Sequence, residues 1–138
     1  MEQALTQGPL ALVVDDHDVV RRALCERIKT SFAQFRLREA ASVGEALKIV
    51  DTERVDIVLM DIGLPGMNGI DGTRAVLEHS PHTTVLVVSI FNDASHRSAA
   101  AMAGARAYVC KRAIGRELIP ALENLINVNS GPTRARLP

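Results

Sequence analysis

Short apolar runs alternate with segments of helical periodicity along the 138-residue chain. Short apolar runs bounded by polar residues are typical of β-strands, whereas apolar residues three or four positions apart are typical of amphipathic helices. The predicted strands are residues 10–14, 37–41, 56–60, 84–88 and 107–110. The predicted helices are residues 18–31, 42–52, 70–79, 94–103 and 117–128. This alternation of strand and helix predicts an α/β protein with a parallel sheet.

Local signals place the ends of several of these helices. Ser42 and Glu45 have the spacing of a capping box, in which the two side chains satisfy amides at the start of a helix. Gly104 follows the helix at 94–103, at the position where glycine commonly ends a helix. Pro120 is expected within about the first turn of the last helix, where a missing amide costs little.

Composition agrees with one ordinary globular domain. The chain is 47% hydrophobic, and its sixteen basic residues balance its sixteen acidic ones, so no charge excess points to nucleic acid or membrane. Cys25 and Cys110 lie far apart without metal-ligand spacing, and they are expected to be reduced thiols in a cytoplasmic protein. No apolar run approaches the length of a membrane span, and the polar start of the chain does not resemble a signal peptide.

Charged and polar side chains follow four of the predicted strands. Asp15 and Asp16 follow the first strand, and Asp61 follows the third. Ser89 and Lys111 follow the fourth and fifth strands. Because the carboxyl ends of parallel strands meet at one edge of a sheet, these side chains are expected to lie close together. Clustered carboxylates suit a divalent metal, and an ammonium group with a hydroxyl suits a phosphoryl group.

Taken together, each at the end of its own strand, these motifs resemble the receiver domain of bacterial two-component response regulators, the CheY-like family. The resemblance extends from about residue 10 to about residue 128. It rests on the Asp15-Asp16 pair, on Asp61 with the Pro65 and Gly69 turn behind it, and on Ser89, Tyr108 and Lys111. Residues 13–17 and 103–109 are most similar to the NarL/FixJ (LuxR-type) subfamily, in which a receiver is joined to a DNA-binding helix-turn-helix.

The resemblance implies a flavodoxin-like, doubly wound sheet of five parallel strands in the order 2-1-3-4-5, with helices on both faces. It also implies a site for Mg²⁺ or Mn²⁺, held by Asp15, Asp16, Asp61 and the backbone carbonyl of Gly63. Asp16 and Asp61 are expected to be direct ligands, and Asp15 to act directly or through water.

The same resemblance assigns roles in phosphoryl transfer. Asp61 is expected to accept the phosphoryl group, and Lys111 to place its ammonium against a phosphoryl oxygen. Ser89 would hydrogen-bond the phosphoryl group, and Tyr108 would then change rotamer and carry the change to an output surface. Such a domain catalyses only its own phosphorylation and dephosphorylation, so it is not expected to be an enzyme in the usual sense.

Partners and boundaries follow from the same family. The phosphoryl donor would be a sensor histidine kinase. A homodimer of this chain is also compatible with the family. DNA would be bound, and transcription regulated, only through an output domain that this chain does not contain, and no membrane contact is expected. Residues 10–128 are predicted to form the receiver, with residues 129–138 a disordered tail or the start of a linker.

Other interpretations of the same residues remain open. The fold could serve as a pseudo-receiver, an interaction module that never takes phosphate. Residues 16–20 also fit the short D-x-D motif of haloacid-dehalogenase-type phosphatases, although Asp61 would then have no role. Asp15 and Asp16 could merely cap the first helix. The histidines are scattered without ligand spacing, which argues against a histidine metal site: His17, His79, His82 and His96.

Three positions depart from the commonest receiver pattern. Gly63 offers no side chain beside the acceptor, Ile90 and Phe91 follow the switch hydroxyl, and Arg112 rather than proline follows Lys111. Neither Gly63 nor Phe91 can orient an attacking water, so the phosphorylated form is expected to lose its phosphoryl group slowly.

Overall fold

A computed structural model describes residues 8–129 of the chain. Its five strands form one sheet in the order β2-β1-β3-β4-β5, and every neighbouring pair is parallel, which confirms the expected topology. The strands are β1 (Leu10–Val14), β2 (Arg36–Ala40), β3 (Ile57–Asp61), β4 (Thr84–Ser89) and β5 (Ala107–Cys110). The helices are α2 (Asp18–Ser31), α3 (Val43–Thr52), α4 (Gly69–His79), α5 (Ala94–Ala103), the 3-10 helix η1 (Lys111–Ala113) and α6 (Ile114–Asn129).

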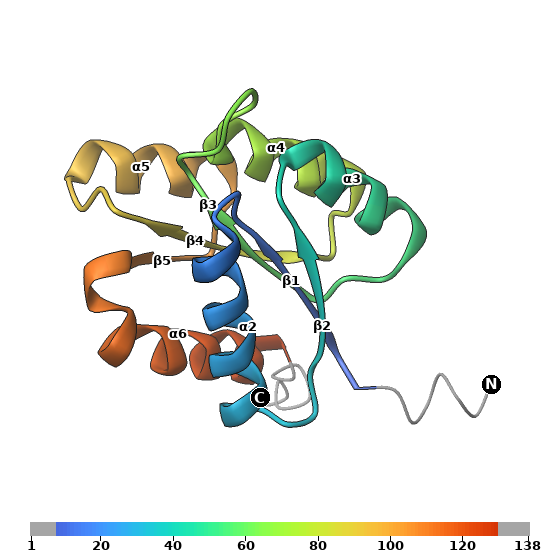
Figure 1. Ribbon diagram of the computed structural model, residues 1–138. Helices are drawn as coiled ribbons and strands as arrows, with labels where there is room; N and C mark the ends of the chain where they lie inside the picture. The colour runs from blue at the N-terminus through green and yellow to red at the C-terminus, as the bar shows by residue number, and fades with distance from the viewer. Residues whose placement is uncertain (1–7, 130–138) are drawn as a thin grey trace, which may run out of the picture.

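Helices cover both faces of the sheet (Figure 1). α3, α4 and α5 lie on one face, and α2 and α6 lie on the other. Successive residues of a strand point to opposite faces, so the central strands supply two cores. Val58 and Met60 pack in the core under α3 and α4, whereas Ile57 and Leu59 pack in the core under α2 and α6. This two-sided burial explains why β3 is apolar at consecutive positions.

The start of α3 shows how a capping interaction also ends a strand. Ser42 Oγ accepts a hydrogen bond from the Glu45 amide at 3.1 Å, as the predicted capping box requires. Glu45 Oε1 accepts from the amide of Ala41 at 2.8 Å rather than from that of Ser42. The Ala41 amide is therefore used by the helix cap, and β2 ends at Ala40, one residue before the predicted end.

Two strands extend one residue further than the apolar pattern predicts. Asp61 pairs with Val88, so β3 includes the carboxylate that was expected to follow it. Ser89 pairs with Cys110 in the same way, at the end of β4. Both predicted site residues are therefore attached to backbone that is held in the sheet.

The last helix begins earlier than predicted, and the predicted place of Pro120 is wrong. α6 starts at Ile114, directly after η1, rather than at 117. Pro120 therefore lies inside α6, where it cannot donate the amide hydrogen bond that the carbonyl of Arg116 would receive in an unbroken helix. Apolar spacing alone set the predicted start, because the first turn of α6 contains glycine and arginine.

The described part of the chain ends with α6. Of the predicted tail at 129–138, Asn129 is the last residue of α6, and residues 130–138 lie outside the described residues. Among residues 8–129, no helix is long and apolar enough to cross a lipid bilayer.

Candidate functional site

The strand register brings the predicted site residues to one edge of the sheet. Val14 of β1 pairs with Met60 of β3, so Asp15 and Asp61 follow at the same level. This edge lies outside the carboxyl ends of the strands, where the chain leaves β1 and β3 towards helices on opposite faces. Open α/β sheets bind ligands at such switch points, so the topology itself favours a site at this position.

Asp61 is a nearly buried carboxylate at the end of β3, with only 6% of the residue exposed. Its Oδ1 accepts a hydrogen bond from the Gly63 amide at 3.3 Å and lies 3.3 Å from Lys111 Nζ. Burial raises the pKa of Asp61, and the charge of Asp15 raises it further, although the ammonium of Lys111 opposes both effects. A cation placed beside this carboxylate would favour its ionised form.

Lys111 links the two buried carboxylates. Its Nζ donates to Asp15 Oδ2 at 3.0 Å and lies 3.3 Å from Asp61 Oδ1. Burial lowers the pKa of Lys111, but the hydrogen bond to Asp15 and the charges of Asp61 and Asp15 outweigh that effect and raise the pKa overall. Lys111 is therefore held as an ammonium group pointing into the acid cluster, and it is not an exposed surface lysine.

Asp15 and Asp16 contribute differently to the cluster. Asp15 is 1% exposed, and its Oδ1 accepts from the His17 amide at 2.9 Å. Asp16 Oδ1 is buried, lies 3.4 Å from His17 Nδ1, and receives no hydrogen bond. The N-cap residue of α2 is His17, and no side chain forms a capping hydrogen bond there. The interpretation of the two acids as capping residues is therefore wrong.

These side chains are suited to a metal ion. Asp15, Asp16, His17 and Asp61 each offer one ligand atom, and the four atoms lie within 4.8 Å of one another. Hard cations such as Mg²⁺ prefer carboxylate oxygens and keep several waters. A buried carboxylate oxygen without a donor, such as Asp16 Oδ1, is costly unless a cation or water meets it. The donor set and this unpaired oxygen therefore fit a divalent metal.

The turn after Asp61 is closed tightly against the end of β3. The amide of Gly69 donates to the carbonyl of Ile62 at 3.0 Å. A Cβ atom on Gly69 would overlap the backbone carbonyl of Asp61, so only glycine fits at the start of α4. Gly63, by contrast, is exposed and has open space where a side chain would point. Its side-chain position leaves the approach to Asp61 uncovered.

Ser89 of β4 and Tyr108 of β5 both form hydrogen bonds to the backbone of Phe91, in the loop between β4 and α5. Ser89 is 1% exposed, and its Oγ accepts from the Phe91 amide at 3.0 Å. The Tyr108 hydroxyl donates to the Phe91 carbonyl at 2.8 Å, and the guanidinium of Arg97 lies 4.7 Å from the Tyr108 ring. Tyr108 is half-buried and bonded to this loop, which is compatible with its predicted role as a switch.

A cavity of about 200 Å³ collects most of these groups. Its polar lining comes from His17, Asp61, Ser89 and Lys111, and its other lining residues are Gly63, Ile90 and Phe91. The cavity therefore has a charged floor and a partly apolar wall. The wall includes a contact that the sequence pattern did not reveal, because the Phe91 ring is stacked on His96 of α5.

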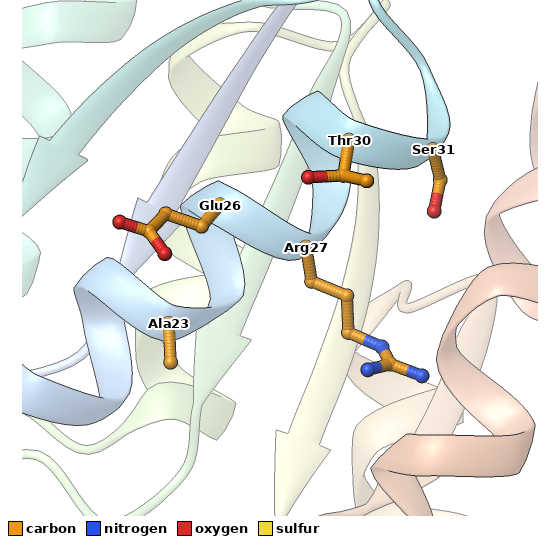
Figure 2. Close-up of a pocket in the computed structure, with 5 residues that line it drawn as sticks. All are labelled: Ala23, Glu26, Arg27, Thr30 and Ser31. Atoms are coloured by element: carbon orange, nitrogen blue, oxygen red, sulfur yellow. The ribbon is translucent and has the colours of Figure 1, made fainter.

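A second hollow lies along the later turns of α2, and its lining residues are Ala23, Glu26, Arg27, Thr30 and Ser31. Figure 2 shows its lining side chains, with Arg27 reaching towards α6, where it donates to the carbonyl of Gly115 at 2.9 Å. A neighbouring hollow of about 300 Å³ is lined mainly by apolar side chains of α2 and by Ile114 of α6. Val19, at the start of α2, is 82% exposed.

The strand order, with an acid cluster at its switch point, defines a doubly wound α/β protein of the flavodoxin-like class. The profile of the response regulator receiver domain family matches residues 11–123. The chain belongs to this family, and no finding favours the phosphatase or the pseudo-receiver interpretation.

Relatives agree with this membership. The chain is 34% identical over 113 residues to the DNA-binding transcriptional activator DevR/DosR of Mycobacterium tuberculosis, covering 82% of this chain and 52% of the relative. A LuxR-family two-component response regulator from Aurantimonas sp. has a TM-score of 0.80 at 31% identity, covering 86% of this chain and 84% of that structure. TrrA of Thermotoga maritima, solved with Mg²⁺ and BeF, has a TM-score of 0.75 at 25% identity, covering 85% and 98%. The chain spans about half the length of the curated relatives it matches.

Proposed function

We propose that this receiver domain accepts a phosphoryl group on Asp61 from a sensor histidine kinase. The observation that carries the proposal is the position of Asp61 at the switch point, with Oδ1 3.3 Å from Lys111 Nζ and two further carboxylates beside it. Here one buried carboxylate faces an open cavity and a retained ammonium group, which suits attack on phosphorus.

The transfer balances as a simple displacement. A carboxylate oxygen of Asp61 forms a bond to phosphorus, and the phosphorus–nitrogen bond of the donor phosphohistidine breaks with its electron pair left on the imidazole. The ammonium of Lys111 would meet a phosphoryl oxygen, and its bond to Asp15 would keep it oriented. Because this ammonium is already in place, little reorganisation is needed as charge develops.

Asp15, Asp16, Asp61 and the carbonyl of Gly63 are the proposed ligands for Mg²⁺ or Mn²⁺. Oxygen donors of this kind match the preference of both ions, and the unpaired Asp16 Oδ1 supports a cation at this position. When bound, the ion would neutralise charge on the three acids and on the transferring group. The presence of Mg²⁺ and BeF in TrrA supports the same assignment here.

The proposed switch connects Ser89 to Tyr108. Ser89 Oγ already accepts from the Phe91 amide, so its own proton is free to be donated to a phosphoryl oxygen. Movement of Ser89 would shift the Phe91 carbonyl, which is the acceptor of the Tyr108 hydroxyl. The signal would thus leave the site through one loop and reach the surface beside α5 and β5.

The apolar hollow between α2 and α6 is a suitable contact surface for the phosphoryl donor. α2 begins two residues after Asp16, and α6 begins three residues after Lys111, so a partner seated there would lie beside the cavity. Exposed Val19 would be covered by such a contact. An output domain joined to this receiver would bind DNA and regulate transcription, as the name of DevR/DosR indicates for that relative, and a homodimer would form through the switched surface.

Replacement of the acceptor tests the proposal. Asp61→Asn keeps the size and the hydrogen bonding of the side chain but removes the nucleophilic carboxylate. Incubation with acetyl phosphate and Mg²⁺ is expected to add one phosphoryl group to the parent protein and none to the variant, as measured by intact-mass spectrometry.

Asp18→Asn is the matched control, because Asp18 is an exposed carboxylate at the start of α2 and lies outside the cluster. This variant is expected to be phosphorylated like the parent. Equal phosphorylation of Asp61→Asn would reject Asp61 as the acceptor, and a parent protein that binds neither phosphoryl group nor beryllofluoride would be a pseudo-receiver.

A further inference from the structure

Phe91 lies at the rim of the Asp61 cavity, because it is one of the lining residues while 41% of it remains exposed. Both polar groups of its backbone are fixed. The amide donates to Ser89 Oγ at 3.0 Å, and the carbonyl accepts from the Tyr108 hydroxyl at 2.8 Å. These bonds fix the backbone but leave the ring free to rotate about its own torsions, so its direction depends on what it contacts.

His96 supplies that contact. Its ring is stacked face to face on Phe91, with centroids 4.2 Å apart and planes inclined by 5°. His96 Nδ1 lies 2.7 and 2.9 Å from the two carboxylate oxygens of Asp93, which also accepts the His96 amide at 3.1 Å. Asp93 caps α5, so the imidazole is tied to the first turn of a helix. The Phe91 ring is therefore stacked on a partner that is itself held in place.

This arrangement bears on the loss of a phosphoryl group from Asp61. In hydrolysis, a water oxygen bonds to phosphorus and the phosphorus–oxygen bond to Asp61 breaks, leaving the electron pair on the carboxylate. The proton of the water leaves to solvent or to the released phosphate. The water must be oriented for attack, and positioned polar groups accelerate such steps. The Phe91 ring offers no hydrogen bond, and Gly63 offers no side chain.

We propose that His96 is a positioning residue that holds Phe91 against the Asp61 cavity and thereby lengthens the life of the phosphorylated form. The inference rests on the proposed function of Asp61. Because a stacked ring pair shifts an equilibrium by about two- to tenfold, loss of the stack should raise the fraction of time that the ring is turned away by a similar factor. Water would then reach the phosphoryl group more often.

Four variants and one control test this role. His96→Leu and Phe91→Leu each remove one ring, and the double variant removes both. His96→Phe keeps an aromatic ring for stacking and loses only the side-chain bonds to Asp93. Met102→Ala is the control, because Met102 is 81% exposed on the same helix and is not in contact with the cavity. Each protein is phosphorylated with acetyl phosphate and Mg²⁺, the donor is removed, and the decay is followed by intact-mass spectrometry.

The expected decay is about two- to tenfold faster in His96→Leu and in Phe91→Leu, with the double variant no faster than the faster single variant. His96→Phe and Met102→Ala are expected to decay within about twofold of the parent. The positioning role would be overturned if His96→Leu decays at the parental rate. It would also be overturned if the increase in decay rate of the double variant equals the product of the two single increases. Either result would leave Asp61 as acceptor. If the parent takes no phosphoryl group, the proposed function fails, and this inference fails with it.

Discussion

At the scale of single residues, negative charge exceeds positive charge at the edge of the sheet that holds the acid cluster. Asp15 and Asp61 are both nearly buried, and one ammonium, that of Lys111, serves both. Asp16 adds a third carboxylate, with one oxygen that lacks a hydrogen-bond donor. Buried charges are costly when they lack partners, so the cluster is under-compensated by the groups that surround it. A divalent cation would supply the missing positive charge.

This imbalance predicts unequal roles for Asp15 and Asp16. Asp16→Ala is expected to weaken Mg²⁺ binding by at least about tenfold and more than Asp15→Ala does, because Asp15 is already occupied by Lys111 and by the His17 amide. Isothermal titration calorimetry measures the affinities directly, which is useful because the chain has no tryptophan. Asp18→Ala, which removes an exposed carboxylate, should bind as the parent does. The reverse order of Asp15 and Asp16 would contradict the ligand scheme.

The sequence places the members of this cluster but not all of their contacts. Positions after strands identify Asp15, Asp16 and Asp61, because parallel strands end at a common edge. The stack of Phe91 on His96 could not be predicted, since it depends on the path of a loop that has no periodic pattern. The unpaired state of Asp16 Oδ1 likewise depends on side-chain geometry that no spacing encodes.

At the scale of elements, α4 lies unusually close to its neighbours through glycines. A Cβ on Gly72 would lie 2.7 Å from Val43 Cγ2 and 3.3 Å from Met60 Cε, so α3 and β3 both touch the helix backbone there. A Cβ on Gly69 would likewise overlap the backbone at the end of β3. These glycines lower the intrinsic stability of the helix but permit the close packing that positions Asp61. Their cost is offset by the contacts they allow.

Alanine substitution should therefore have opposite effects at two glycines. Gly72→Ala is expected to lower the free energy of unfolding by about 1–3 kcal/mol, because overpacking against β-branched Val43 exceeds the gain in helix propensity. Gly115→Ala, in α6, meets open space and should raise it by up to about 1 kcal/mol. Urea unfolding followed by circular dichroism measures both. Stabilisation by Gly72→Ala would show that Val43 moves aside freely.

Element types were predictable from apolar periodicity, whereas some element ends were not. β2 ends at Ala40 because the next amide is used by Glu45, which is a choice between two hydrogen-bond partners. α6 begins at Ile114 through a 3-10 turn, in a stretch where the apolar repeat has not yet begun. In both places a local interaction, rather than the hydrophobic pattern, decides the boundary.

At the scale of the whole molecule, two cores share one sheet. Leu59 and Met60 are neighbours in β3, yet they pack on opposite faces. Neither core can lose its packing without disturbing strands that the other core needs. The sheet therefore couples the helices on the two faces, and the domain is expected to unfold as a single cooperative unit.

Substitution on either face tests this coupling. Leu59→Ala and Met60→Ala, both fully buried in the parent, are each expected to cost about 2–5 kcal/mol. In both variants, urea unfolding measured by circular dichroism should coincide with unfolding measured by the fluorescence of Tyr108, the single tyrosine. Tyr108 packs against the core that contains Met60. A Tyr108 transition that separates from the loss of secondary structure would show that the two faces unfold independently.

The turn after Asp61 is closed at its base by backbone hydrogen bonds, so its length can change without moving Asp61. The carbonyl of Ile62 accepts from the amides of both Leu64 and Gly69, which ties the two ends of the turn together. The segment between them, including Pro65, is largely exposed. Extra residues inserted after Pro65 would lengthen a closed loop at small entropic cost. The base of the loop would still hold Asp61 in register, so this is a permissive place for grafting a peptide epitope.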